Sequence, residues 1–180
     1  MGQQHKEGTV RPLTIGEIEM ARELYGNTIN YKKVVVHCDS YFPFGAQSKD
    51  TAMAPNGELW FRSERYQPDF SAATIGSRHT FVHEMAHVWQ RERGMWVRTR
   101  GLFSGVVDYR YRLDGKKKLK DYGMEQQASI IADYWLWKKH GNKEWLDFAK
   151  LRIVRFLGVS DKNTFELYEY TLSDFFKQRG

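Results

Sequence analysis

Cysteine is scarce in this sequence: Cys38 is the only one among its 180 residues. A single cysteine excludes an internal disulfide, so a chain of this length must be held together by a buried apolar core. No apolar run approaches the roughly 20 residues of a membrane-spanning helix. Residues 1–8 also lack the apolar stretch of a secretory signal peptide. If the protein works outside the cytoplasm, we therefore expect another route to deliver it.

Strong charge of either sign is missing as well. The 28 basic and 22 acidic residues leave a net charge of +6, which surface solubility explains as well as an anionic partner does. Basic and aromatic residues mix over positions 95–122, but a solvated hairpin accounts for them more simply than a nucleic-acid surface. The apolar fraction of 41% is typical of a folded globule. Since no repeat or low-complexity linker is present, we predict one domain over residues 13–180 behind a flexible lead of residues 1–12.

Local signals along the chain predict an α+β fold. Thr14 and Glu17 have the spacing of a capping box, which predicts a helix that begins there and is ended by Gly26. Strands are predicted at 33–37 and at 58–62, the second being a candidate edge strand for an extended substrate. We expect a mainly helical fold with a small antiparallel sheet. The remaining signals predict helices at 77–93, 124–139, 143–157 and from 160 onward, and a hairpin arm at 107–113 that turns at 114–115.

The helix predicted at 77–93 carries the pattern His83-Glu84-x-x-His87. Positions i and i+4 lie on one face of a helix, so both imidazoles point at a common spot that suits one tetrahedral zinc ion. Glu84 falls beside that spot, where it can reach a water on the metal. An accidental pair on a solvated helix is the alternative, but the residues around the two histidines are mostly apolar. We therefore predict that this helix binds Zn²⁺ and that the small sheet lies beside it.

A catalytic zinc normally takes three protein ligands and leaves one position for water. The extended motif with a third histidine six residues after His87 is absent, because position 93 is an arginine. His140 falls at the end of a predicted helix, whereas Glu125 falls in the first turn of an apolar helix beside small residues. We predict Glu125 as the third ligand, the alternative being a carboxylate placed there by the helix dipole alone. Asp133, two turns further on, could hydrogen-bond a ligand imidazole.

The predicted ligand segments and two other stretches of the chain resemble a known family. Residues 83–90 and 123–128 look like the gluzincin-type branch of zinc metallopeptidases. Together with 17–26 and 53–61, they are similar to the zincin domain fused to the C-terminus of some VgrG spike proteins of the bacterial type VI secretion system. The resemblance implies a zincin-like fold and an antibacterial effector or toxin that acts in the periplasm of a target bacterium. It also implies a secretion spike and an immunity protein as partners, although this sequence has no spike domain of its own.

The activity that we predict is hydrolysis of a peptide bond by a metal-activated water. Glu84 is the expected general base, and zinc on His83, His87 and Glu125 is expected to polarise the scissile carbonyl. A cell-wall hydrolase that acts on peptidoglycan, and a zincin-like domain that binds or senses without cleaving, are the open alternatives. A nucleic-acid binder is a remote third. The donor for the oxyanion stays open among Tyr122, Tyr134, His140 and the arginines of residues 98–112.

Overall fold

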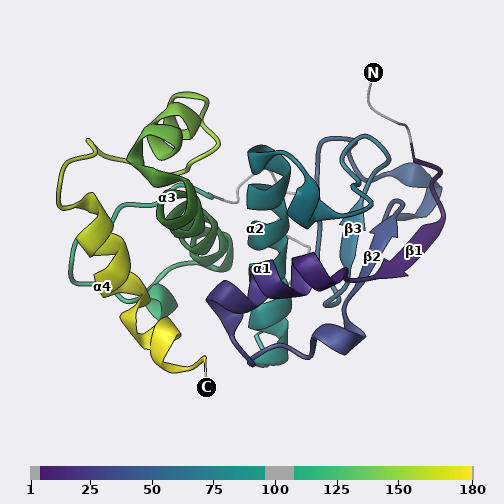
Figure 1. Ribbon diagram of the computed structural model, residues 1–180, viewed down its shortest axis with the longest axis horizontal. Helices are drawn as coiled ribbons and strands as arrows, with labels where there is room; N and C mark the ends of the chain where they lie inside the picture. Colours follow the sequence, from purple (N-terminus) through teal and green to yellow (C-terminus); the bar gives the residue numbers. More distant parts are fainter. Residues whose placement is uncertain (1–4, 96–107, 180) are drawn as a thin grey trace. The chain divides into compact units, whose positions relative to one another are not determined.

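The computed structural model describes residues 5–95 and 108–179. The chain divides into two compact units, residues 1–97 and 98–180. Each unit has its own helices and buried side chains, and the first contains the sheet (Figure 1). The single domain expected over residues 13–180 stays a prediction. Among the helices of the described ranges, none is both long enough and apolar enough to cross a membrane.

The sheet of the first unit has three strands, in the order β1 (Thr9–Pro12), β2 (Val35–Cys38) and β3 (Leu59–Phe61), side by side in Figure 1. β1 and β2 run antiparallel, whereas β2 and β3 run parallel. The predicted α+β class is confirmed, but the sheet is mixed and not wholly antiparallel. The reason is the long connection over residues 39–58, which carries the chain back before β3 begins, as a parallel pair requires.

Residues 9–12 correct the predicted flexible lead of residues 1–12, because they form β1. The strand pairs along its whole length with β2 and ends with Pro12 opposite Val35. Proline has no N–H to donate, so an edge strand is the place where a sheet tolerates it. The strand is mostly exposed. An exposed edge strand needs few apolar side chains, and the sequence pattern therefore did not reveal it.

α1 (Ile15–Tyr25) begins at the predicted capping box. Thr14 Oγ1 accepts a hydrogen bond from the Glu17 N–H at 3.1 Å, and the Glu17 carboxylate accepts one from the Thr14 N–H at 2.9 Å. At the other end Gly26 has a positive φ of 53°, and its N–H donates to the carbonyl of Arg22. Both ends of this helix therefore confirm the local signals.

Glu17 also holds neighbouring segments together. It is fully buried, and the guanidinium of Arg11 in β1 donates to both its oxygens, at 2.7 and 2.9 Å. The Phe70 N–H donates a further bond at 2.8 Å. Arg11 in turn donates to the carbonyl of Gln67 and to the hydroxyl of Tyr66. A buried carboxylate is tolerated when it is paired and hydrogen-bonded, so this ion pair joins β1 and α1 to the segment before the next helix.

α2 (Ile75–Glu92) is the helix that carries the histidine motif. It begins two residues before the predicted start, because Thr74 caps it by accepting a hydrogen bond from the Ser77 N–H at 3.2 Å. Gly94, with a φ of 74°, follows its end. A left-handed residue just after a helix is a common stop signal, and glycine takes that conformation without strain.

Aromatic rings join the sheet to α2. Phe61 of β3 lies 4.5 Å from Phe70, and Phe70 lies 5.4 Å from Phe81 of α2, measured between ring centroids. Tyr25 at the end of α1 donates its hydroxyl hydrogen to an α2 carbonyl at 2.8 Å. Phe81 is two residues before His83, about 200° away around the helix. The packing therefore puts the sheet beside the motif helix, as predicted, and leaves the histidine face on the other side.

α3 (Met124–Lys150) and α4 (Thr164–Lys177) are the helices of the second unit. Two successive helices are predicted where α3 lies, and the break between them is present at Gly141, whose φ of 84° and ψ of 177° are not helical. α3 then ends at Lys150 and not near residue 157, because Arg152 turns the chain with a φ of 58°. Fully buried Trp145 and Tyr168 contribute to the core of this unit.

The hairpin arm predicted over residues 107–113 is wrong for the part that the structure describes. Tyr111 is buried and forms a parallel bridge with Phe156, exchanging backbone hydrogen bonds of 2.7 and 3.2 Å with the two residues that flank it. A turn does follow, in which the Asp114 carboxylate accepts two backbone N–H bonds. It leads into a short 3-10 turn at Leu119–Asp121 and not into a second strand. Burial of the Tyr111 ring favours pairing inside the unit over an exposed arm.

Candidate metal centre

α2 presents two histidines one turn apart. The rings of His83 and His87 have centroids 5.1 Å apart, so the predicted common face is confirmed. His83 is half-buried and His87 is buried, with 4% of its surface exposed. Glu84 is buried as well, at 6% exposure. Desolvating two imidazoles and a carboxylate on one helix is costly unless partners compensate for the lost water.

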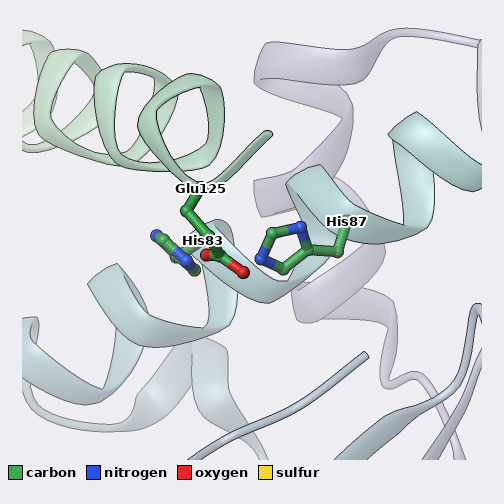
Figure 2. A group of neighbouring side chains, drawn as sticks. All are labelled: His83, His87 and Glu125. Atoms are coloured by element: carbon green, nitrogen blue, oxygen red, sulfur yellow. The ribbon is translucent and has the colours of Figure 1, made fainter. Parts of the chain in front are cut away.

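Glu125 lies in the first turn of α3, as predicted. The side chain of Gln126 accepts a hydrogen bond from the Gly123 N–H at 3.1 Å, which fixes this turn. The potential ligand atoms of His83, His87 and Glu125 all lie within 4.8 Å of one another, and Figure 2 shows the three side chains turned toward one another. Two imidazole nitrogens and one carboxylate oxygen form a ligand set of catalytic zinc sites. The donors present therefore fit this metal.

Gln90 is a residue of this site that the sequence reasoning missed. Its Oε1 lies 2.8 Å from His87 Nδ1, and its side chain is fully buried. An amide oxygen can only accept, so this contact is a hydrogen bond when His87 Nδ1 carries a hydrogen. The three-residue spacing between His87 and Gln90 on a predicted helix is the signal that could have revealed the contact.

His79 is a second buried residue that the sequence reasoning passed over. It lies one turn before His83 on α2 and is 6% exposed. The four-residue spacing that links the motif histidines also links His79 to His83. Among the described residues, however, the group of convergent ligand atoms contains His83, His87 and Glu125 and not His79. His79 is therefore a matched residue against which substitutions of the ligands can be compared.

Asp133 takes part in the core of the second unit. The buried carboxylate accepts hydrogen bonds from the Tyr111 hydroxyl at 2.6 Å and from the Arg155 N–H at 2.9 Å, and the hydroxyls of Tyr111 and Tyr168 are hydrogen-bonded to each other. Burial, aided by the nearby carboxylate, raises the pKa of both tyrosines well above that of a free phenol, so both stay protonated. The proposed bond from Asp133 to a ligand imidazole stays a prediction.

The candidates for the oxyanion donor differ in their surroundings. The Tyr122 hydroxyl donates to the carbonyl of Arg112 at 2.7 Å, and burial raises the pKa of Tyr122 to about 12. Tyr134 and His140 each lie against an aromatic ring of the same unit. The arginines before residue 108 lie outside the described residues. The choice among these side chains therefore stays open.

β3 corrects the expectation that residues 58–62 offer an edge to an extended substrate. The Trp60 N–H donates to the Met53 carbonyl at 2.8 Å, and the Met53 N–H donates to the Trp60 carbonyl at 3.1 Å. Because β2 occupies the other side of β3, these two bonds use the outward backbone groups of the central residue. A substrate strand cannot add at Trp60 while Met53 holds this position.

Comparison with known proteins places the chain. No family model matches the sequence. The type VI secretion system spike protein VgrG2b of Pseudomonas aeruginosa is 39% identical over 135 residues, a match that covers 71% of this chain and 13% of the spike protein. The chain thus spans only a small part of the length of that relative. The solved effector domain of Pseudomonas aeruginosa VgrG2b is 32% identical with a TM-score of 0.66, covering 86% of this chain and 88% of that domain.

Identity and coverage of this extent define the class to which the chain belongs: a secretion effector domain. More specifically, the chain belongs to the family of VgrG effector domains of type VI secretion systems, which includes the VgrG2b domain. The likeness extends over most of both domains and is not confined to the motif helix. The comparisons therefore confirm the family of VgrG effector domains that the sequence motifs suggested.

Proposed function

We propose that this effector domain is a zinc-dependent metallopeptidase, a hydrolase of peptide bonds. The observation that carries the proposal is the group of His83, His87 and Glu125, whose ligand atoms lie within 4.8 Å of one another. A structural zinc site is closed by four protein ligands, whereas a set of three leaves a position for water and substrate. Glu84, next to His83 in the sequence and buried, supplies the carboxylate that such chemistry needs.

The roles of the individual residues follow from this ligand set. Zinc bound there supplies Lewis acidity and lowers the pKa of water at the open position. The Glu84 carboxylate would accept a proton from the attacking water and pass it to the leaving amine. Gln90, by accepting a hydrogen bond from His87 Nδ1, would leave the lone pair of Nε2 available to a bound metal. The buried surroundings of Glu84 and His87 strengthen these electrostatic interactions.

The route to the target is part of the same proposal. We infer that a type VI secretion spike carries the domain into the periplasm of a target bacterium, where it cleaves a protein or peptide and acts as a toxin. The relative that supports this inference is itself a type VI secretion spike protein. A producing cell that makes a periplasmic peptidase needs protection from it, so we also propose an immunity protein as a partner.

Replacement of Glu84 by alanine tests the mechanism. Loss of a general base lowers turnover by about 10²–10⁴-fold. We expect a loss of at least this size on an unfolded protein substrate, while elemental analysis still finds one equivalent of zinc. His79→Ala, a substitution of a buried polar residue on the same helix, should keep both the zinc and the activity. Full activity of the Glu84→Ala variant on any substrate would contradict the proposal.

Two substrates separate the alternatives. Purified sacculi that release muropeptides, with no cleavage of unfolded protein, would identify a cell-wall hydrolase in place of a peptidase. A zinc-loaded protein that cleaves neither substrate would identify a domain that binds or senses. Removal of zinc by a chelator should abolish the expected peptidase activity, and added zinc should restore it, because the ligand set holds the metal reversibly.

A further inference from the structure

We propose that Gln90 is a positioning residue that fixes the tautomer of His87 and thereby sets the affinity of the site for zinc. This inference rests on the proposed zinc site and adds a residue to it. His87 Nδ1 and Gln90 Oε1 are 2.8 Å apart, and the two residues are 4% and 0% exposed. Since the amide oxygen only accepts, the imidazole must donate from Nδ1. Its second nitrogen, Nε2, is then the one with a lone pair.

The tautomer matters because a neutral imidazole carries its hydrogen on either nitrogen. Only a nitrogen without hydrogen can bind a metal, so a ring protonated at Nε2 would have to rearrange before binding through that atom. A buried acceptor at Nδ1 favours the tautomer with its hydrogen on Nδ1 before any metal binds. Outer hydrogen bonds of this kind orient ligand rings in metal sites, and their loss typically lowers metal affinity by about 10–100-fold.

The end of α2 holds Gln90 in place through its backbone. The Met95 N–H donates to the Gln90 carbonyl at 3.0 Å, and the Gly94 N–H donates to the Arg91 carbonyl at 2.9 Å. These two bonds, together with the left-handed φ of 74° at Gly94, make a Schellman motif. Gln90 is thus anchored in the last turn of the helix, three residues from His87 and on the same side. The glycine stop signal in the sequence therefore also supports the metal site.

The acceptor strength of the side chain at position 90 should change the zinc affinity in a predictable direction. Glutamine offers a neutral acceptor, whereas a carboxylate at the same place would be a stronger one and would make the imidazole a more basic ligand. Gln90→Glu should therefore bind zinc more tightly than the wild type. Gln90→Met, which has a similar length and no oxygen, should bind it more weakly. A glutamine that only fills space would not produce shifts of opposite sign.

The experiment measures the zinc dissociation constant of the full chain by competition with a chromogenic chelator. We expect Gln90→Met to raise the constant by about 10–100-fold and Gln90→Glu to lower it. Gln47→Met is the matched control: Gln47 is also a buried glutamine, but it bonds backbone carbonyls of Thr51 and Trp60. Its zinc affinity should equal that of the wild type. As a second measurement, ¹⁵N NMR of the zinc-free protein should show His87 protonated at Nδ1 in the wild type and not uniformly so in Gln90→Met.

The outcomes separate this inference from the proposed function. A wild type that binds no zinc overturns the proposed function and this inference with it. A wild type that binds zinc, with an unchanged constant in Gln90→Met, overturns this inference alone. If Gln90→Met does not fold, Gln90→Glu decides: tighter binding supports the positioning role, and weaker or equal binding overturns it.

Discussion

Two buried polar groups of the first unit are stabilised in different ways. The Glu17 carboxylate is matched by groups of the chain itself, namely the Arg11 guanidinium and the backbone N–H groups of Thr14 and Phe70. His87 has one ring nitrogen bonded to Gln90, and its ligand atom belongs to a convergent set that suits an external cation. A carboxylate neutralised by its own arginine stabilises the fold. Imidazole and carboxylate donors that converge on one point are instead suited to bind a metal.

The first way to test this comparison is to remove the structural carboxylate. Glu17→Ala leaves the Arg11 charge and two backbone N–H groups without their acceptor, and breaking a buried pair in this way costs about 3–5 kcal/mol. We expect the free energy of unfolding, measured with urea, to fall by this amount. Glu19→Ala, an exposed position on the same helix, should change it by no more than about 0.5 kcal/mol. Equal effects of the two substitutions would contradict a special role of Glu17.

The second test removes a predicted ligand. Glu125→Ala should weaken zinc binding by about 100-fold or more, because even outer-shell partners of a metal are worth 10–100-fold. Glu166→Ala is the matched control, since Glu166 is also an acidic residue in the first turn of a helix. Its zinc affinity should not change. Should the Glu125→Ala variant hold zinc as tightly as the wild type, another residue must be the third ligand.

The third and smallest effect concerns the helix end that holds Gln90. Gly94→Ala forces a left-handed conformation on an L residue, which costs about 1 kcal/mol. Gly76→Ala, near the other end of α2, should instead stabilise the protein by up to about 0.5 kcal/mol. An added Cβ would meet no atom within 4 Å at either position, so a steric clash contributes to neither change in stability. Thermal unfolding of the two variants should shift in opposite directions.

Signals that act over a few residues predicted the structure well. The capping box of Thr14 and Glu17, the common face of the motif histidines and the break near Gly141 all depend on backbone geometry within one or two turns. The two wrong strand predictions involve partners that are distant in sequence. β1 was missed because its stability comes from pairing with β2, and the hairpin arm was wrong because Tyr111 pairs with a segment beyond α3. Periodicity and propensity carry no information about such partners.

The sequence by itself determined which side chains of the motif helix share a face, because a four-residue spacing places His83 and His87 on one face of any α-helix. It also indicated Glu125 as the candidate that completes their ligand set. The tertiary structure decided what surrounds them: the Arg11 partner of Glu17 and the Met53 backbone that occupies the edge of β3. The physical reason is that helical spacing follows from local backbone geometry alone. Long-range pairs form only where the packing of the whole unit outweighs the entropy of bringing distant residues together.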